Sequence, residues 1–421
     1  MQTIKPNAAL LTAGGIKNHK EDDTMGPAQL HDFITEAIAR HHALAIELSD
    51  DLYAHPELPD QEFRSSAKMV ELLKAAGYEV EYPYMGYPTA FRAELSNGPG
   101  PHAAILVEYD ALPGLGHACG HNVHGSMSIL AALALMDLKD QFPGKLSVIG
   151  TPAEEEDGKK IGMAARGAFD GLDLAVMNHS YSGGVSLPDM DLLGLQCYIL
   201  DFHGTSAHAA AGPWKGHSAL ACARKFLDLV DARRECFTGD IRFNGVILDG
   251  GRAPNILPDK AQVRLEYRAD SRAKMNMLNE IMHKCAKGAS IALDCEYTYA
   301  KGFDGFDDMV CVPALQKEVS GLIKALGHPC GAPQTPSGSS DVGNTSYRCP
   351  TIQPLIAICQ APYALHTIEF REETIKEPAH KAIADGAQLI AELVYRTMTD
   401  ESFRSEVNSS FQAALKAKLD A

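Results

Sequence analysis

The sequence predicts an α/β protein with a largely parallel sheet covered by helices and a second, smaller α/β domain inserted into it. Apolar strand-like segments alternate with helix-period segments over the first half of the chain. From about residue 194 the order becomes strand-helix-strand-strand-helix-strand, and the first alternation resumes after Gly302. A chain of 421 residues exceeds the size at which one hydrophobic core stops growing, so two domains are expected.

The first part of the chain supplies the main sheet and its helices. Helix-period patterns are expected at residues 28–49, 65–77, 128–135 and 160–169, and strands near 79–83, 89–95, 103–108, 145–150 and 172–177. In parallel sheets the loops that follow the strands meet at one edge, where α/β proteins place their chemistry.

Residues 194–303 are expected to form the inserted domain. Its strands are predicted at 194–202, 241–248, 260–268 and 291–300, and its helices at 215–234 and 271–287. This order is that of a ferredoxin-like unit. Residues 28–193 and 304–421 should then fold together as one domain, preceded by an N-terminal extension at residues 1–27.

The composition excludes several classes of partner. A net charge of −16 argues against nucleic acid or an anionic membrane surface, and no run approaches the roughly 20 apolar residues of a membrane span. The ten cysteines form no Cys-x-x-Cys pair, which favours free thiols in a reducing compartment. We therefore expect a cytoplasmic protein that acts on a small molecule.

Three imidazoles and a thiol lie within eight residues, between an expected strand and an expected helix. They belong to His117, Cys119, His121 and His124. Imidazole nitrogen and thiolate sulfur are ligands that zinc prefers. Taken alone, the segment leaves alternatives open, because such residues are often structural and because Cys119 could be the nucleophile of a cysteine hydrolase.

The next loops add further metal-binding side chains. An acidic run that includes Glu154 and Glu155 follows the strand that ends at Gly150, and His179 follows the next strand. An acidic run is usually only a solvated face, but here it shares a sheet edge with Cys119. With His366 near the C-terminus, these residues would satisfy two metals with three protein ligands each if one ligand bridges: Cys119, His121, Glu155, His179 and His366.

Six segments in order carry a resemblance to a known family. They are residues 108–113 (EYDALP), 116–122 (GHACGHN), 152–155 (PAEE), 204–209 (GTSAHA), 253–258 (APNILP) and 339–344 (SSDVGN). The chain resembles metallopeptidase family 20, the aminoacylase, carboxypeptidase and amidohydrolase group. It is most similar to the branch that contains the aminobenzoyl-glutamate hydrolases and the dipeptidases related to aminoacylase-1.

The resemblance implies a zinc-peptidase-type fold with a lid domain that dimerises, and two divalent cations, Zn²⁺ or Mn²⁺, with Co²⁺ also suitable. Cys119 matches the bridging ligand. His121 and His179 match the ligands of one metal, and Glu155 and His366 those of the other. The reaction it implies is hydrolysis of the amide bond of an N-acyl amino acid or dipeptide with a free carboxylate.

Other roles follow from the same resemblance. Glu154 matches the catalytic base, and His208 matches a lid histidine that reaches the reacting oxyanion of the partner subunit. Asn255 and Arg268 match positions that hold the substrate carboxylate, although Arg268 could equally be a surface strand residue. The segment around Gly338 could present backbone amides to substrate.

Departures from the family pattern leave alternatives open. Most members carry His-x-Asp where this chain has Glu108, Tyr109 and Asp110. Glu108 thus stands where the family has a ligand histidine, and His121 is expected to take over that ligand's role. Asp110 is expected to orient a ligand imidazole. The acidic run replaces a glycine-rich continuation, so the roles of Glu154 and Glu155 could shift by one. A non-catalytic homologue that retains the fold is a further alternative.

Overall fold

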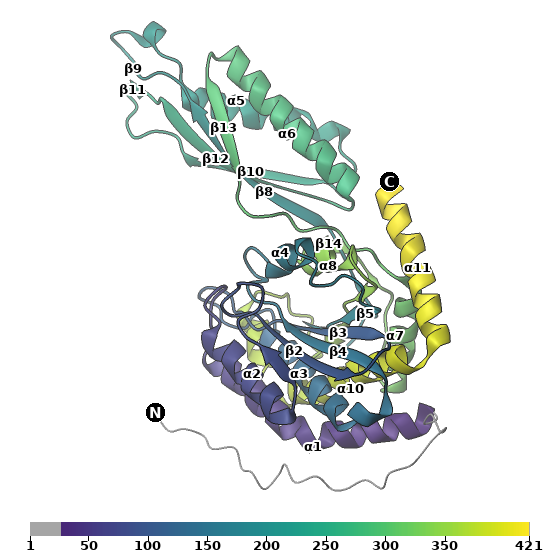
Figure 1. Cartoon of the computed structure of the whole chain (residues 1–421). Coiled ribbons are helices and arrows are strands. Elements are labelled where there is room, and N and C mark those ends of the chain that lie inside the picture. The colour runs from purple at the N-terminus through teal and green to yellow at the C-terminus, as the bar shows by residue number, and fades with distance from the viewer. Residues whose placement is uncertain (1–26, 421) are drawn as a thin grey trace.

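The computed structural model describes residues 27–420 and shows two bodies, a main domain and a lid (Figure 1). The expected extension at residues 1–27 therefore lies outside the described residues, apart from Pro27, where the first helix begins. No helix in the described part is long and apolar enough to cross a membrane.

The main domain is built on a six-stranded mixed sheet, in the order β1-β2-β4-β3-β5-β15. The strands are β1 (Glu79–Glu81), β2 (Phe91–Asn97), β3 (His102–Val107), β4 (Gly144–Gly150), β5 (Leu174–Val176) and β15 (Thr351–Ile352). Strands β4, β3, β5 and β15 are parallel, whereas β1 and β2 are antiparallel to their neighbours. The predicted α/β fold with a mostly parallel sheet is confirmed.

Both faces of this sheet are covered, which is why its central strands are continuously apolar. Along β3, Ile105 and Val107 pack into the core on one face, while Ala104 and Leu106 pack into a smaller core on the other. The first face carries four long helices: α1 (Pro27–Ala54), α2 (Phe63–Ala76), α3 (His121–Asp137) and α10 (Glu377–Thr399). The second face carries α4 (Lys159–Ala165) and α8 (Val342–Ser346).

Helix α3 is buried along almost its whole length, because it packs on β3 and is surrounded by α1, α2 and α10. Such a helix is apolar all round rather than amphipathic. Since α10 comes from the last part of the chain, residues from both ends of the sequence share one core.

The remaining elements of the main domain are short or peripheral. Two small strand pairs are parallel: β6 (His179–Tyr181) with β16 (Leu355–Ala357), and β7 (Met190–Leu192) with β14 (Gln334–Gly338). The other helices are η2 (Lys139–Gln141), α7 (Pro313–Ala325), α9 (Ile368–Glu373) and α11 (Glu401–Asp420). Helix α4 is shorter than the predicted 160–169, because Gly167 takes a positive φ of 82°.

The lid is a four-stranded antiparallel sheet in the order β10-β12-β8-β13. Its strands are β8 (Gly194–His203), β10 (Arg242–Asp249), β12 (Lys260–Ala269) and β13 (Glu296–Lys301). Helices α5 (Ala219–Ala232) and α6 (Arg272–Ala292) pack on one face and close a separate core. This is the strand order of a ferredoxin-like unit.

Two details of the lid differ from the prediction. Helix α6 runs to Ala292 because Cys285, Ala286 and Ala289 continue its buried stripe, so the last strand begins only at Glu296. A small ribbon, β9 (Ala207–His208) with β11 (Ile256–Leu257), lies at the tip of the lid farthest from the main domain (Figure 1). Short helical turns, η3 (Pro213–Lys215) and η4 (Arg234–Cys236), complete it.

Candidate metal centre

The candidate centre lies at the carboxyl ends of β3, β4 and β5. Because β3 pairs in parallel with both β4 and β5, the loops that follow these strands converge. The loop after β3 ends at Gly120, whose positive φ and close approach to Ser180 exclude a side chain: a Cβ there would lie 2.6 Å from Cβ of Ser180. This turn places Cys119 and His121 at the start of α3.

His366 joins the centre from the other end of the chain. Its backbone N–H donates a hydrogen bond to the carbonyl of Ala118, with a distance of 2.9 Å. Its side chain is 50% exposed, whereas the Cys119 and His121 side chains are buried. The centre therefore opens to solvent on the side of His366.

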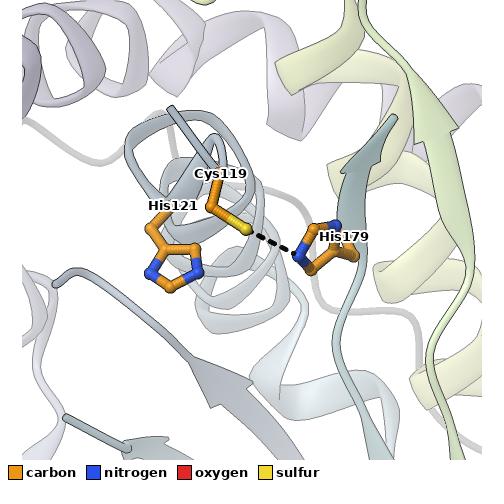
Figure 2. Close-up of side chains that lie close together, drawn as sticks. All are labelled: Cys119, His121 and His179. Atoms are coloured by element: carbon orange, nitrogen blue, oxygen red, sulfur yellow. Dashed lines mark hydrogen bonds between the residues drawn. The ribbon is translucent and has the colours of Figure 1, made fainter. Parts of the chain in front are cut away.

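Five side chains form two donor groups that share one atom. Sγ of Cys119 lies 3.5 Å from Nε2 of His179 and 3.4 Å from Nε2 of His366. Donor atoms within 4.8 Å of one another make up each group: Cys119, His121 and His179 in one, Cys119, Glu155 and His366 in the other. Figure 2 shows the first group, in which the rings of His121 and His179 lie on opposite sides of the Cys119 sulfur.

The free donor atoms of this cluster fit a cation. Among the described residues, Nε2 of His121 and Oε1 of Glu155 are buried without a hydrogen-bond partner. Nδ1 of His121 lies 3.0 Å from Asp110 Oδ1, and Nδ1 of His179 lies 2.8 Å from the carbonyl oxygen of Ser180. Such partners orient an imidazole so that its second nitrogen faces a metal.

Asp110 connects two of these side chains. Besides contacting His121, its carboxylate accepts a hydrogen bond from the backbone N–H of Glu155, at 3.0 Å. The preceding Ala153 takes a positive φ of 59°, and its N–H donates to Glu62 Oε1 at 2.8 Å. The acidic run is thus held as a tight turn against the centre rather than as a solvated face.

Both glutamates of this turn lie beside His121. Nε2 of His121 is 3.9 Å from Glu154 Oε2 and 3.7 Å from Glu155 Oε1. Of the two, Glu155 also approaches His366, with Oε2 at 3.5 Å from Nε2. Glu155 therefore approaches both His121 and His366, whereas Glu154 approaches His121.

Burial disfavours the charged forms of these side chains when no cation is bound. Burial and the charge of Glu155 raise the pKa of the Cys119 thiol well above its usual value. Burial, together with the charges of Glu108 and Glu155, likewise raises the pKa of Glu154 well above its usual value. Burial lowers the pKa of His179 to about 4. A bound cation reverses this preference for thiol and carboxylic acid, because its charge favours thiolate and carboxylate.

A buried polar network behind the centre was missed by sequence reasoning. Glu108 contacts His124 on one side and the ammonium of Lys160 on the other, and Lys160 also binds Asp341. One pattern could have placed Lys160 inside: it shares the buried face of α4 with Met163 and Ala164, three and four residues on.

The predicted substrate-binding residues and His208 lie in two separate places. A guanidinium N–H of Arg268 donates to Ser339 Oγ at 3.3 Å, next to Gly338, whose carbonyl accepts a hydrogen bond from the N–H of Leu193. Arg268 and Gly338 thus meet where the lid joins the main domain.

His208 and Asn255 are exposed at the far tip, where His208 pairs with Ile256 across the β9–β11 ribbon. Strand β12, with ten residues, separates this tip from Arg268 by roughly 30 Å. Asn255 and Arg268 of one chain therefore lie too far apart to bind the same carboxylate. His208, in β9, lies at the tip of the lid that points away from the main domain (Figure 1).

Comparison with known proteins identifies relatives over most of the chain. Residues 104–396 match the model of peptidase family M20/M25/M40. The Xaa-Arg dipeptidases of mouse and human are 32% and 30% identical, covering 88% and 99% of this chain and 89% and 98% of their own. A p-aminobenzoyl-glutamate hydrolase chain of Escherichia coli is 30% identical over 66% of this chain and 61% of its own.

Solved structures show the same fold. A dinuclear metal-binding peptidase of family M20 from Bacillus subtilis superposes with a TM-score of 0.67 at 19% identity, covering 86% of this chain and 99% of its own. The predicted resemblance and the predicted class, a hydrolase of amide or peptide bonds, are confirmed. The chain belongs to peptidase family M20/M25/M40.

Proposed function

We propose that this protein is a two-metal dipeptidase that cleaves the peptide bond before a C-terminal basic residue and requires the free carboxylate of that residue. The observation that carries the proposal is the pair of donor groups that share Cys119, with Glu154 beside them. The two relatives named Xaa-Arg dipeptidase, which match most of this chain, support the choice of a basic C-terminal residue. The net charge of −16 supports it too, because it favours a cationic ligand.

In this proposal His121 and His179 hold one cation, Glu155 and His366 hold the other, and Cys119 bridges them. Zinc, manganese and cobalt all suit a set of imidazole, thiolate and carboxylate ligands. When bound, the cations supply Lewis acidity, which activates water and polarises the scissile carbonyl.

Glu154 is the proposed acid-base residue. Its carboxylate accepts the proton of the attacking water and returns that proton to the departing nitrogen. Only 11% of its side chain is exposed, so few solvent molecules compete for that proton. Asp110 holds the imidazole of His121 in place during this transfer.

The lid supplies the substrate contacts. Arg268 is placed to bind the substrate carboxylate with two parallel N–H donors, close to Gly338 at the base of the lid. His208 and Asn255, at the exposed tip, complete the site of a second subunit in a homodimer formed through the lids. Their distance from their own metal centre supports this assignment.

A cytoplasmic location is part of the proposal. All ten cysteines are free, and six of them are buried in cores or in the centre. Free thiols persist in a reducing compartment.

A substrate panel with the metal-reconstituted full chain tests the proposal. We expect manganese- or zinc-dependent cleavage, fastest for Xaa-Arg and Xaa-Lys dipeptides and slower for hippurate, aminobenzoyl-glutamate and acetyl amino acids. The Glu154→Gln variant is the matched inactive control. Absence of turnover on every amide with two metals bound would favour the non-catalytic homologue, and activity without metal that depends on Cys119 would favour a cysteine hydrolase.

A further inference from the structure

A lysine side chain is completely buried beside the candidate metal centre. Lys160 lies in the first turn of α4, and its side chain has 0% exposure. Its ammonium donates to Glu108 Oε1 and to Asp341 Oδ1, both at 2.6 Å. Its backbone N–H donates to the second oxygen of Asp341 at 3.0 Å. A buried ammonium with two carboxylate partners is a costly feature that folding stability alone rarely explains.

The carboxylates around Lys160 form a compact acidic cage. Oxygen atoms of Glu108, Glu154 and Asp341 all lie within 4.8 Å of one another. Carboxylates this close repel one another unless a positive charge lies among them. Burial alone would lower the pKa of Lys160, but the charges of Asp341, Glu108 and Glu154 outweigh it and raise that pKa above its usual value. Lys160 is therefore a permanent cation in the cage.

An all-oxygen cage of this kind also suits a divalent cation such as Mn²⁺ or Mg²⁺. Glu154 would then become a metal ligand. A carboxylate that binds a cation can no longer accept a proton from water, so a cation in the cage would remove the catalytic base. Lys160 binds only the other two carboxylates of the cage and leaves Glu154 free.

We propose that Lys160 is a built-in cation that occupies the cage of Glu108, Glu154 and Asp341, limits the centre to two metals and keeps Glu154 available as the base. This inference rests on the proposed function. It assigns Lys160 as a positioning residue, since its ammonium binds Glu108 and Asp341 and none of the five proposed metal ligands.

The primary test is manganese binding by the full-length Lys160→Met variant, which keeps the apolar stem but removes the charge. After equilibrium dialysis against Mn²⁺, metal analysis should find two manganese ions in the native chain and three in the variant. The variant's kcat should fall by about ten-fold or more at excess Mn²⁺ with KM little changed, because only the base is affected. Part of the rate should return when Mn²⁺ is limited to two equivalents.

Lys159→Met is the matched control. The neighbouring ammonium binds Asp60 and Asp157 at the surface, outside the cage. This variant should bind two manganese ions and keep the native dependence of rate on Mn²⁺. A second charge-removing variant, Lys160→Gln, keeps a hydrogen-bond donor, so it tests the role of the charge with less disturbance of the network.

The outcomes separate the two hypotheses. Fewer than two manganese ions in the native chain would overturn the proposed function. Two ions in the native chain and two in both Lys160 variants would overturn only the role of Lys160. If neither variant folds, refolding with Mn²⁺ decides: recovery of the native circular dichroism by Mn²⁺ means that a divalent cation replaces the ammonium, and no recovery overturns the proposal.

Discussion

Sγ of Cys119 lies 3.5 Å from Nε2 of His179, a residue sixty positions further along the chain. The contact follows from strand pairing, because Cys119 follows β3, His179 follows β5, and these strands are parallel neighbours. The same sulfur also approaches His366. Cys119 is therefore the one side chain common to both donor groups.

Removing the shared sulfur should affect both cations. Cys119→Ala is expected to lower the metal content below two per chain, since each donor group loses a ligand. Cys119→Asp keeps an anionic ligand and should retain more metal. Metal analysis after dialysis measures both variants. Undiminished metal content in Cys119→Ala would show that the sulfur does not bridge.

The two neighbouring glutamates should give different phenotypes. Glu154→Gln should bind two metals but lose roughly 10²–10⁴-fold in kcat, which is the usual cost of losing a general base. Glu155→Gln should lose metal, because its carboxylate is the one within reach of His366. Metal analysis combined with kcat measures both, and exchanged phenotypes would mean that the two roles are shifted by one residue.

Arg268 should control recognition of the substrate carboxylate. Arg268→Ala is expected to raise KM by about 10- to 100-fold, corresponding to a charged hydrogen bond of about 1.5–3 kcal/mol. A substrate with a C-terminal carboxamide should show a much smaller change. Arg264→Ala, on the same strand but 48% exposed and paired with Glu266, is the control. Equal effects on acid and amide substrates would refute the assignment.

His208 should act in the site of a partner subunit. We expect His208→Ala to lower kcat with metal content intact, whereas His217→Ala, at an exposed histidine near the same ribbon, should be near native. Mixing inactive His208→Ala and Glu154→Gln chains under subunit exchange should restore part of the activity, since one site of each mixed dimer has both residues. Proven exchange with no recovery would exclude this role.

Asp189 should make stability depend on pH. Burial raises its pKa to about 7, despite hydrogen bonds from Gln316 and Gln353. An aspartate in an unfolded chain has a pKa of about 4. The native state therefore binds a proton that the unfolded chain releases, so stability falls as pH rises from about 4 to about 7 and then levels off.

Asp189→Asn removes this ionisation. The variant should match the native chain near pH 4 and exceed its unfolding free energy above pH 7 by up to about 4 kcal/mol, at about 1.4 kcal/mol per pKa unit. Urea denaturation of the metal-free proteins at several pH values measures the difference. A gap that does not grow with pH would contradict the assignment.

Much of the fold and of the site could be predicted from local sequence patterns. The apolar segments around β3 and β4 and the strand-to-helix loop at Cys119 were predictable, because the periodicity of buried residues reports secondary structure directly. The convergence of Cys119, Glu155 and His179 was predictable as well, since parallel strands bring the loops at their carboxyl ends together. The antiparallel lid followed from the order of its elements.

Only the tertiary structure decided which charges are buried together. Lys160 and Asp341 are 181 residues apart, and nothing in either local sequence shows that they share a cage. The separation of Asn255 from Arg268 was equally invisible, because it depends on the direction and length of β12. Sequence periodicity determines which faces of helices and strands are buried, whereas long-range pairing determines which side chains meet there. Because burial removes water from charged groups, those groups must pair with one another.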